Sequence, residues 1–159
     1  KKFLLMLNNL DYKSIENIKI FIQSPKQFLD TLNQLLKKLK KDYEIQEFYK
    51  NIDEILSITD IAITRAGSGT INDLIRYRIP SIIFQLPHSI YNHQFFNAKY
   101  LADKNGAILM DETNFNLDNN SAILKELITN IEKQKLMKKS LEQIIIPEAN
   151  QIMFEKIFI

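Results

Sequence analysis

Apolar residues follow two different spacings along this chain, and segments with the two spacings alternate. Runs in which apolar residues alternate with polar ones, or follow one another, predict β-strands, whereas apolar residues three and four positions apart predict amphipathic helices. The predicted strands cover residues 18–22, 43–48, 60–64, 81–85 and 107–110. The predicted helices cover residues 1–10, 26–40, 52–58, 70–78, 93–104, 121–131, 133–143 and 147–158.

The alternation of strands and helices predicts the fold class. Strands separated by helices pair in parallel through right-handed crossovers, which gives an α/β fold with a doubly wound parallel sheet. The run SIIFQ at 81–85 is almost continuously apolar, so we expect this strand to be buried on both faces. With 159 residues and no recognisable linker, the chain is expected to form one domain.

Composition narrows the classes of function. Hydrophobic residues make up 45% and charged residues 25% of the chain, which is typical of a globular protein. The net charge of +2 gives no indication of a nucleic-acid partner. Cysteine is absent, which excludes disulfides and thiolate metal sites, and the two histidines are His88 and His93. The sequence therefore predicts no metal site and no cofactor.

Most of the candidate chemistry lies in two polar turns that follow neighbouring predicted strands, where open α/β sheets bind ligands. In the first turn, RAGSGT at 65–70, glycine permits close approach of a ligand, and the helix start offers amides to an anion such as phosphate. Arg65 adds a positive charge, and Ser68 and Thr70 add hydroxyl groups. The alternative is a purely structural turn in which Thr70 caps the helix and Asp73 completes a capping box.

Asp73 lies one helical turn after Thr70. Its carboxylate could accept hydrogen bonds from two vicinal hydroxyls, as an acidic residue does for ribose in dinucleotide-binding folds. The alternative is an acidic side chain that only interacts favourably with the helix dipole.

The second turn leads into the predicted helix at 93–104. His93, Gln94 and Asn97 lie near its start, and amides suit sugar hydroxyls because an amide group both donates and accepts hydrogen bonds. The alternative is a solvated first turn that Asn92 caps.

In this order and spacing, these residues resemble the C-terminal, donor-binding half of the MurG family (glycosyltransferase family 28-like). The family pattern is an aspartate-opened strand, an R-(S/A)-G-x-x-T turn, an acidic residue three positions on, a proline-led strand and a D-H-Q-x-x-N-A helix start. The matching residues of this chain are Asp60, Arg65-Ala66-Gly67, Thr70, Asp73, Pro80, Asn92-His93-Gln94 and Asn97-Ala98.

The resemblance implies a function and a fold. Enzymes of the family transfer N-acetylglucosamine from UDP-N-acetylglucosamine (UDP-GlcNAc) to lipid-linked muramyl pentapeptide in peptidoglycan synthesis, with inversion at the anomeric carbon. Their fold, called GT-B, has two Rossmann-like α/β domains with the active site between them. This chain would be the donor-binding domain, which makes it part of a hexosyltransferase.

The resemblance also implies roles for single residues. Phe48 would cap the uracil, and the backbone of Tyr49 would read its edge. Asp73 would hold the ribose hydroxyls. Thr70 would contact a donor phosphate. The amide of Ser68 and the side chains of Gln94 and Asn97 would read the hydroxyls of N-acetylglucosamine, with His93 beside them. The expected substrate-binding residues are Phe48, Tyr49, Arg65, Gly67, Ser68, Thr70, Asp73, His93, Gln94 and Asn97.

Two residues depart from the family pattern. Asp73 stands where glutamate is usual, and Arg78 stands where glycine is common. The glycine-rich loop that would cradle the diphosphate and the N-terminal acceptor domain are not in the sequence. We therefore expect residues 1–159 to be a single donor-nucleotide-binding domain, truncated at its N-terminus and inactive alone. No catalytic base is predicted in it.

The expected partners follow from the same resemblance. They are UDP-GlcNAc and, through the missing domain, a lipid-linked acceptor. The expected location is the cytoplasm, peripheral at the inner face of the plasma membrane. One alternative is a stand-alone subunit with a membrane partner, like the eukaryotic subunit that extends dolichol-linked sugar, although that family usually has histidine where Arg65 stands. Another is an inactive relic, suggested by the truncated start and by Asp73 and Arg78.

Overall fold

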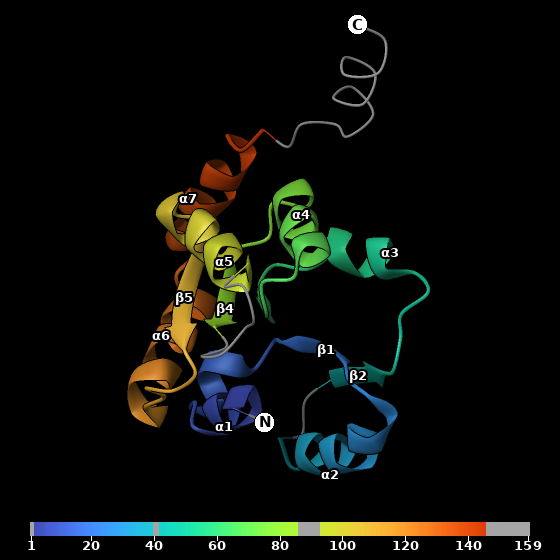
Figure 1. Ribbon diagram of the computed structural model, residues 1–159. Coiled ribbons are helices and arrows are strands. Elements are labelled where there is room, and N and C mark those ends of the chain that lie inside the picture. Colours follow the sequence, from blue (N-terminus) through green and yellow to red (C-terminus); the bar gives the residue numbers. More distant parts are fainter. Residues whose placement is uncertain (1, 40–41, 86–92, 146–159) are drawn as a thin grey trace, which may run out of the picture.

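A computed structural model describes residues 2–39, 42–85 and 93–145, in which strands and helices alternate as expected (Figure 1). The strands are β1 (Lys19–Gln23), β2 (Asp42–Gln46), β3 (Ala62–Thr64), β4 (Ser81–Gln85) and β5 (Ala107–Asp111). The helices are α1 (Lys2–Asn8), α2 (Leu29–Leu39), α3 (Ile52–Ser57), α4 (Ser68–Arg76), α5 (His93–Asp103), α6 (Leu117–Thr129) and α7 (Ile131–Glu142). Two short 3-10 helices, Tyr12–Ile15 and Lys26–Phe28, precede β1 and α2.

All the described strand pairs are parallel, which confirms the predicted α/β class. The strands form two hydrogen-bonded groups, β1–β2 and β3–β4–β5, rather than one continuous sheet. In the first group Lys19 lies opposite Asp42, and in the second Ser81 lies between the register partners Ala62 and Ala107. Strand β4 is therefore the central strand of its group.

Helices cover the strands from two sides. One hydrophobic cluster joins buried residues of α1, α2 and α6 to strand residues of both groups, among them Ile20 and Ile82. A second cluster joins buried residues of α4, α5 and α7 to Ile83 and Ala107. Figure 1 shows α4, α5 and α7 gathered at one end of the view and α1 and α2 at the other. The two clusters give the doubly wound arrangement that the alternation predicted.

Strand β4 is buried on both faces, as its apolar run predicted. Ile82 belongs to the first cluster and Ile83 to the second, and both side chains are fully buried. Burying a side chain of this size stabilises the fold by roughly 1.5–3 kcal/mol. The carboxyl end of β4, between those of β3 and β5, is consequently held by a dense core.

The start of α4 differs from one of the expectations. The helix begins at Ser68, and its N-cap is Gly67 in an extended conformation (φ −64°, ψ 145°). The first helical bond runs from the amide of Ile71 to the carbonyl of Gly67, at 2.9 Å. Thr70 therefore lies inside the first turn, and the suggested capping box of Thr70 and Asp73 is wrong.

Other helix ends also differ from the expected bounds. Helix α6 begins at Leu117 rather than at residue 121, because the Asn116 side chain caps it by accepting from the amide of Asn119 at 3.0 Å. Asn130 caps α7 in the same way, accepting from the amide of Lys133. The helix predicted at 147–158 lies outside the described residues.

Candidate functional site

Residues of the first polar turn and of α5 meet at the carboxyl ends of β3 and β4. The first turn directly follows β3, and α5 is the next described element after β4. Asn97 of α5 donates from its side-chain amide to the carbonyl of Ala66 in the first turn, at 3.2 Å. The structure thus brings together segments that lie about thirty residues apart in the sequence. His88 and Asn92 lie outside the described residues.

The start of α4 has the features of an anion site. Ser68 and Gly69 are exposed, and a Cβ added at Gly69 would meet nothing within 4 Å. The first amides of a helix have no acceptor within the helix, and they carry the positive end of its dipole. Arg65, also exposed, lies just before this turn. Phosphate groups bind well to such an arrangement.

Gln94 adds an unpaired polar atom beside the first turn of α5. Its Oε1 is shielded from solvent and has no hydrogen-bond partner among the described residues. Buried polar atoms are nearly always paired, so this oxygen can accept a hydrogen bond from a ligand or a water. Gln94 and Asn97 lie on neighbouring turns of α5, and His93 is exposed at its first residue.

Phe48 and Tyr49 follow β2 and differ sharply in burial. The side chain of Phe48 is 67% exposed, whereas Tyr49 is fully buried. The Tyr49 hydroxyl donates to the carbonyls of Glu44, at 2.9 Å, and Ile22, at 3.3 Å. Burial, followed by the charge of Glu44, raises the pKa of this hydroxyl. Tyr49 therefore anchors the loop, and the adjacent Phe48 ring is left available for stacking.

Asp73 lies on α4, close to an acidic residue of α3 that the sequence analysis did not identify. Burial, and then the charge of Asp53, raises the pKa of Asp73, while Arg76 acts in the opposite direction. The hydroxyl of Tyr77 donates to Asp53 at 2.5 Å, which fixes α3 beside α4. No pattern within α3 marks Asp53, because its proximity to Asp73 arises only in the folded chain.

Arg65 is paired with a residue that sequence reasoning also missed. Its guanidinium lies 2.9 Å from a carboxylate oxygen of Glu112, in the loop that follows β5. The Lys2 ammonium donates to the main-chain carbonyl of Glu112. The charged groups around the first turn therefore come from the chain segments after β3 and β5 and from α1.

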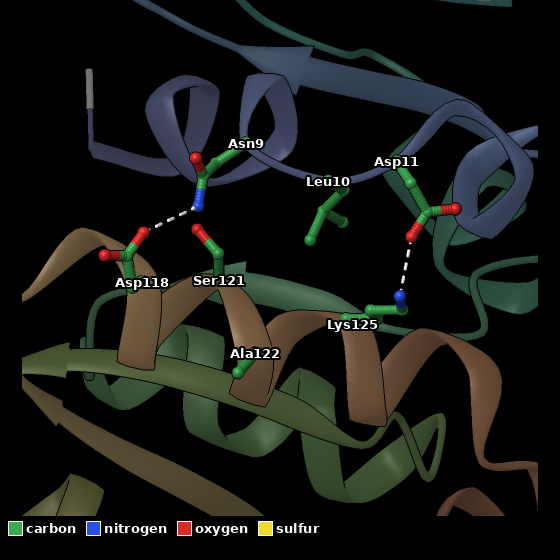
Figure 2. A pocket seen from close by; sticks show the side chains of 7 residues that line it. All are labelled: Asn9, Leu10, Asp11, Asp118, Ser121, Ala122 and Lys125. Carbon is green, nitrogen blue, oxygen red and sulfur yellow. Dashed lines mark hydrogen bonds and ion pairs between the residues drawn. The ribbon is translucent and has the colours of Figure 1, made fainter.

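A separate hollow of about 290 Å³ lies between the end of α1 and α6 (Figure 2). Its charged and amide groups are paired with each other: Asn9 donates to Asp118 at 3.3 Å, and Lys125 lies 2.6 Å from Asp11. None of the predicted site residues lines it. It is not part of the candidate site.

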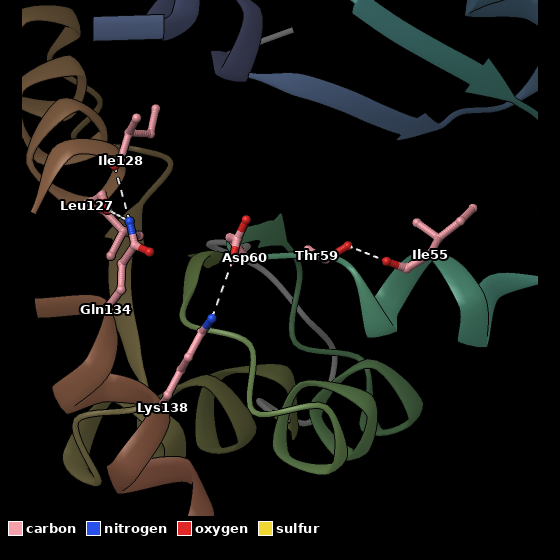
Figure 3. A network of polar contacts seen from close by, with 7 residues as sticks. All are labelled: Ile55, Thr59, Asp60, Leu127, Ile128, Gln134 and Lys138. Atoms are coloured by element: carbon pink, nitrogen blue, oxygen red, sulfur yellow. Dashed lines mark hydrogen bonds and ion pairs between the residues drawn. The ribbon is translucent and has the colours of Figure 1, made fainter. Parts of the chain in front are cut away.

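Asp60, the aspartate of the predicted strand motif, is exposed just before β3. Its carboxylate lies 3.4 Å from the ammonium of Lys138 on α7 (Figure 3). This contact joins the entry of β3, at the opposite end of the strand from the first polar turn, to α7. Asp60 is thus a structural member of the motif.

Among the residues that the structure describes, no three acidic or histidine side chains form a cluster suited to a metal ion.

Comparison with curated proteins gives relatives that share one name. Two are named UDP-N-acetylglucosamine--N-acetylmuramyl-(pentapeptide) pyrophosphoryl-undecaprenol N-acetylglucosamine transferase. The relative from Campylobacter jejuni is 31% identical over 148 residues, covering 91% of this chain and 43% of the relative. The relative from a Wolbachia of Drosophila simulans is 30% identical over 135 residues, covering 85% of this chain and 39% of the relative.

The crystal structure of MurG from Acinetobacter baumannii has a similar fold. It superposes with a TM-score of 0.79 at 23% identity, over 96% of this chain and 48% of that protein. This chain therefore spans less than half the length of the proteins it matches. The family description "Glycosyltransferase family 28 C-terminal domain" matches residues 2–151, and the chain belongs to that family.

Proposed function

We propose that this chain is the donor-binding domain of an inverting glycosyltransferase. The enzyme would transfer N-acetylglucosamine from UDP-GlcNAc to lipid-linked N-acetylmuramyl pentapeptide in peptidoglycan synthesis. The observation that carries the proposal is the contact of Asn97 on α5 with Ala66 in the first polar turn, beside the open start of α4. The names of the relatives from Campylobacter and Wolbachia support the choice of donor and acceptor.

The geometry supports a division of the donor among separate groups of residues. The diphosphate would lie at the start of α4, near Arg65, Gly67 and Thr70, and the amide of Ser68 would contact N-acetylglucosamine. Phe48 would stack on the uracil, with the Tyr49 backbone at its edge. Asp73 would accept hydrogen bonds from the ribose. His93, Gln94 and Asn97 would contact N-acetylglucosamine, and this would provide a partner for Gln94 Oε1.

The chemistry assigned to this domain is stabilisation of the leaving group. In an inverting transfer, the acceptor hydroxyl attacks the anomeric carbon and gives its proton to a base outside the described residues. The bond to the diphosphate breaks, and UDP leaves with additional negative charge. Amides at the α4 start and the Arg65 guanidinium would stabilise this charge, since preorganised donors act most strongly where charge develops. We assign no catalytic base to the described residues.

The proposal extends to the organisation of the enzyme. Residues 1–159 would form a single donor domain that works with an acceptor-binding domain, and the full enzyme would act peripherally at the cytoplasmic face of the membrane. Among the described helices, none is long and apolar enough to span a bilayer. Because the acceptor would bind to the other domain, activity is expected only when that domain is present.

Calorimetric titration of the chain with UDP-GlcNAc and with ATP tests the proposal. We expect UDP-GlcNAc to bind selectively. Asp73→Ala and Asn97→Ala should each raise its Kd by roughly 5- to 150-fold, because loss of a hydrogen bond in such a site costs about 1–3 kcal/mol. Asp103→Ala, which removes a carboxylate paired with Lys99 at the other end of α5, is the matched control.

Two results would contradict this function. One is equal binding of ATP and UDP-GlcNAc, which would indicate a general nucleotide site. The other is measurable UDP-GlcNAc binding that Asp73→Ala and Asn97→Ala leave unchanged. Absence of any binding would favour the inactive relic.

A further inference from the structure

The loop between β5 and α6 is held rigidly by its own side chains. The carboxylate of Asp111 accepts hydrogen bonds from the amide of Thr113 (2.7 Å), the Thr113 hydroxyl (2.6 Å) and the side-chain amide of Asn114 (2.7 Å). These hydrogen bonds lower the pKa of Asp111 from its usual value and therefore favour its charged form. An ionised aspartate with three donors forms a stable turn at the end of β5.

The next residue, Glu112, is fastened at both its backbone and its side chain. Its main-chain carbonyl accepts from the ammonium of Lys2, at the start of α1. The Lys2 ammonium also lies 4.9 Å from the centre of the Phe115 ring, so it is held on the same loop. The side chain of Glu112 is 25% exposed and lies 2.9 Å from Arg65. The carboxylate is therefore presented to Arg65 from a fixed support.

The ion pair spans the carboxyl edge of the β3–β4–β5 group. Arg65 directly follows β3, and Glu112 directly follows β5, with β4 between them. Arg65 is also adjacent to Ala66, which Asn97 contacts, and lies three residues before the first residue of α4. A solvent-accessible ion pair contributes little to stability. The more important effect of the Arg65–Glu112 pair is that it fixes the guanidinium beside the candidate anion site.

We propose that Glu112 is a positioning residue that holds the Arg65 guanidinium at the diphosphate subsite of the donor. This inference rests on the proposed function. Arginine has a long, flexible side chain, and a group that is already fixed loses less conformational entropy when a ligand binds. A guanidinium has several N–H donors, so Arg65 can keep its contact with Glu112 while it donates to a phosphate oxygen.

The sign of the effect separates positioning from simple electrostatics. A carboxylate close to a diphosphate repels it, so removal of the Glu112 charge would strengthen binding if Coulomb repulsion dominated. If Glu112 positions Arg65, its removal weakens binding instead. The two explanations thus predict opposite changes in Kd for one substitution.

Calorimetry with UDP-GlcNAc and with uridine, which has no phosphate, tests the inference on the full chain. We expect Arg65→Gln to raise the Kd for UDP-GlcNAc by about tenfold or more, and Glu112→Gln to raise it by about 3- to 10-fold. Neither should change the affinity for uridine. In the Arg65→Gln background, Glu112→Gln should have no further effect, because Glu112 acts through Arg65.

Two further variants serve as controls. Glu112→Asp keeps the charge and should recover part of the affinity. Glu126→Gln breaks a comparable exposed pair, between Glu126 and Lys133 at 3.0 Å, on helices away from the site, and should leave both affinities unchanged. Thermal unfolding of Glu112→Gln should match that of the unaltered chain, which excludes loss of folding as the cause.

The outcomes distinguish this inference from the proposed function. Tighter or unchanged UDP-GlcNAc binding by Glu112→Gln, or an equal loss for uridine, would overturn the positioning role and leave the donor site in place. If Glu112→Gln weakened UDP-GlcNAc binding further in the Arg65→Gln background, the positioning role would also be overturned. Failure of the unaltered chain to bind UDP-GlcNAc would overturn both.

Discussion

The carboxylate of Asp73 illustrates how a neighbouring helix sets the chemistry of one residue. Burial and the charge of Asp53 raise its pKa. Because the folded pKa lies above that of the unfolded chain, the charged carboxylate lowers stability at neutral pH, and this penalty disappears as the pH falls below the usual range of aspartate. In the proposed ribose role, the charged carboxylate accepts from both hydroxyls, so donor binding should weaken as the pH falls through the raised pKa.

Asp53→Asn should therefore lower the pKa of Asp73, since it removes the second largest cause of the increase. Donor binding by the variant should persist to lower pH than in the unaltered chain. Titration of the Asp73 carboxyl group by NMR measures the change directly. Glu54→Gln is the control. It removes an equal charge from the same turn of α3, at a residue whose carboxylate accepts from Asn51, and should leave the pKa of Asp73 unchanged. An unchanged pKa in Asp53→Asn would refute this account.

Arg78 shows a second residue-scale effect. It follows α4 with a φ of 54°, in the left-handed region that glycine adopts without steric cost. This conformation suits the glycine that the family resemblance leads us to expect here, and it makes arginine costly at this position. The side chain offsets little of the cost, because its pairing with Glu142, at 3.2 Å, is exposed.

Arg78→Gly should therefore be more stable than Arg78→Ala, by about 1 kcal/mol, because both lose the ion pair but only glycine relieves the backbone. The free energies of unfolding in urea measure the difference. If alanine proved as stable as glycine, the left-handed conformation would carry no appreciable cost at this position.

At the scale of elements, Gln134 joins α6 to α7. It is buried on α7, and its side-chain amide donates to the carbonyls of Leu127, at 2.8 Å, and Ile128, at 3.1 Å (Figure 3). The last carbonyls of a helix have no partner within the helix, so Gln134 supplies one from the following helix. The polar residue lies in the packed layer because it completes the hydrogen bonds of α6.

Gln134→Leu should lower the free energy of unfolding by about 1–3 kcal/mol, since it leaves these buried carbonyls unpaired. Urea unfolding followed by far-ultraviolet circular dichroism measures the loss. Lys135→Ala alters an adjacent, exposed residue whose partner is Glu132 and should change stability little. Equal stabilities of the two variants would show that the carbonyls are satisfied in another way.

At the scale of the whole molecule, one hydrophobic cluster joins the two strand groups. Ile20 of β1 and Ile82 of β4 pack into it, although their groups share no ladder of hydrogen bonds among the described strands. Packing rather than pairing therefore holds β1–β2 beside β3–β5. The site depends on this arrangement, because Phe48 follows β2, while Asp73 and Asn97 follow β3 and β4.

Local patterns identified most of the architecture and many of the site candidates. The apolar run of β4 predicted burial on both faces, and the position of the glycine turn after a strand predicted the candidate anion site. Helix starts were less accurate: Asn116 caps α6 through its side chain, a signal present in the sequence that periodicity alone overlooks. Gly67, rather than Thr70, caps α4 because an extended glycine fits that position.

The sequence by itself determined the order of the described elements, the parallel α/β class and the position of the first polar turn, because spacing and turn chemistry act over a few residues. Tertiary structure alone decided the partners of the site residues. Arg65 meets Glu112 across 47 positions, and Asp73 is affected by Asp53 on another helix. Such contacts depend on how strands and helices pack, and a side chain's partner and pKa depend on distances that no local pattern encodes.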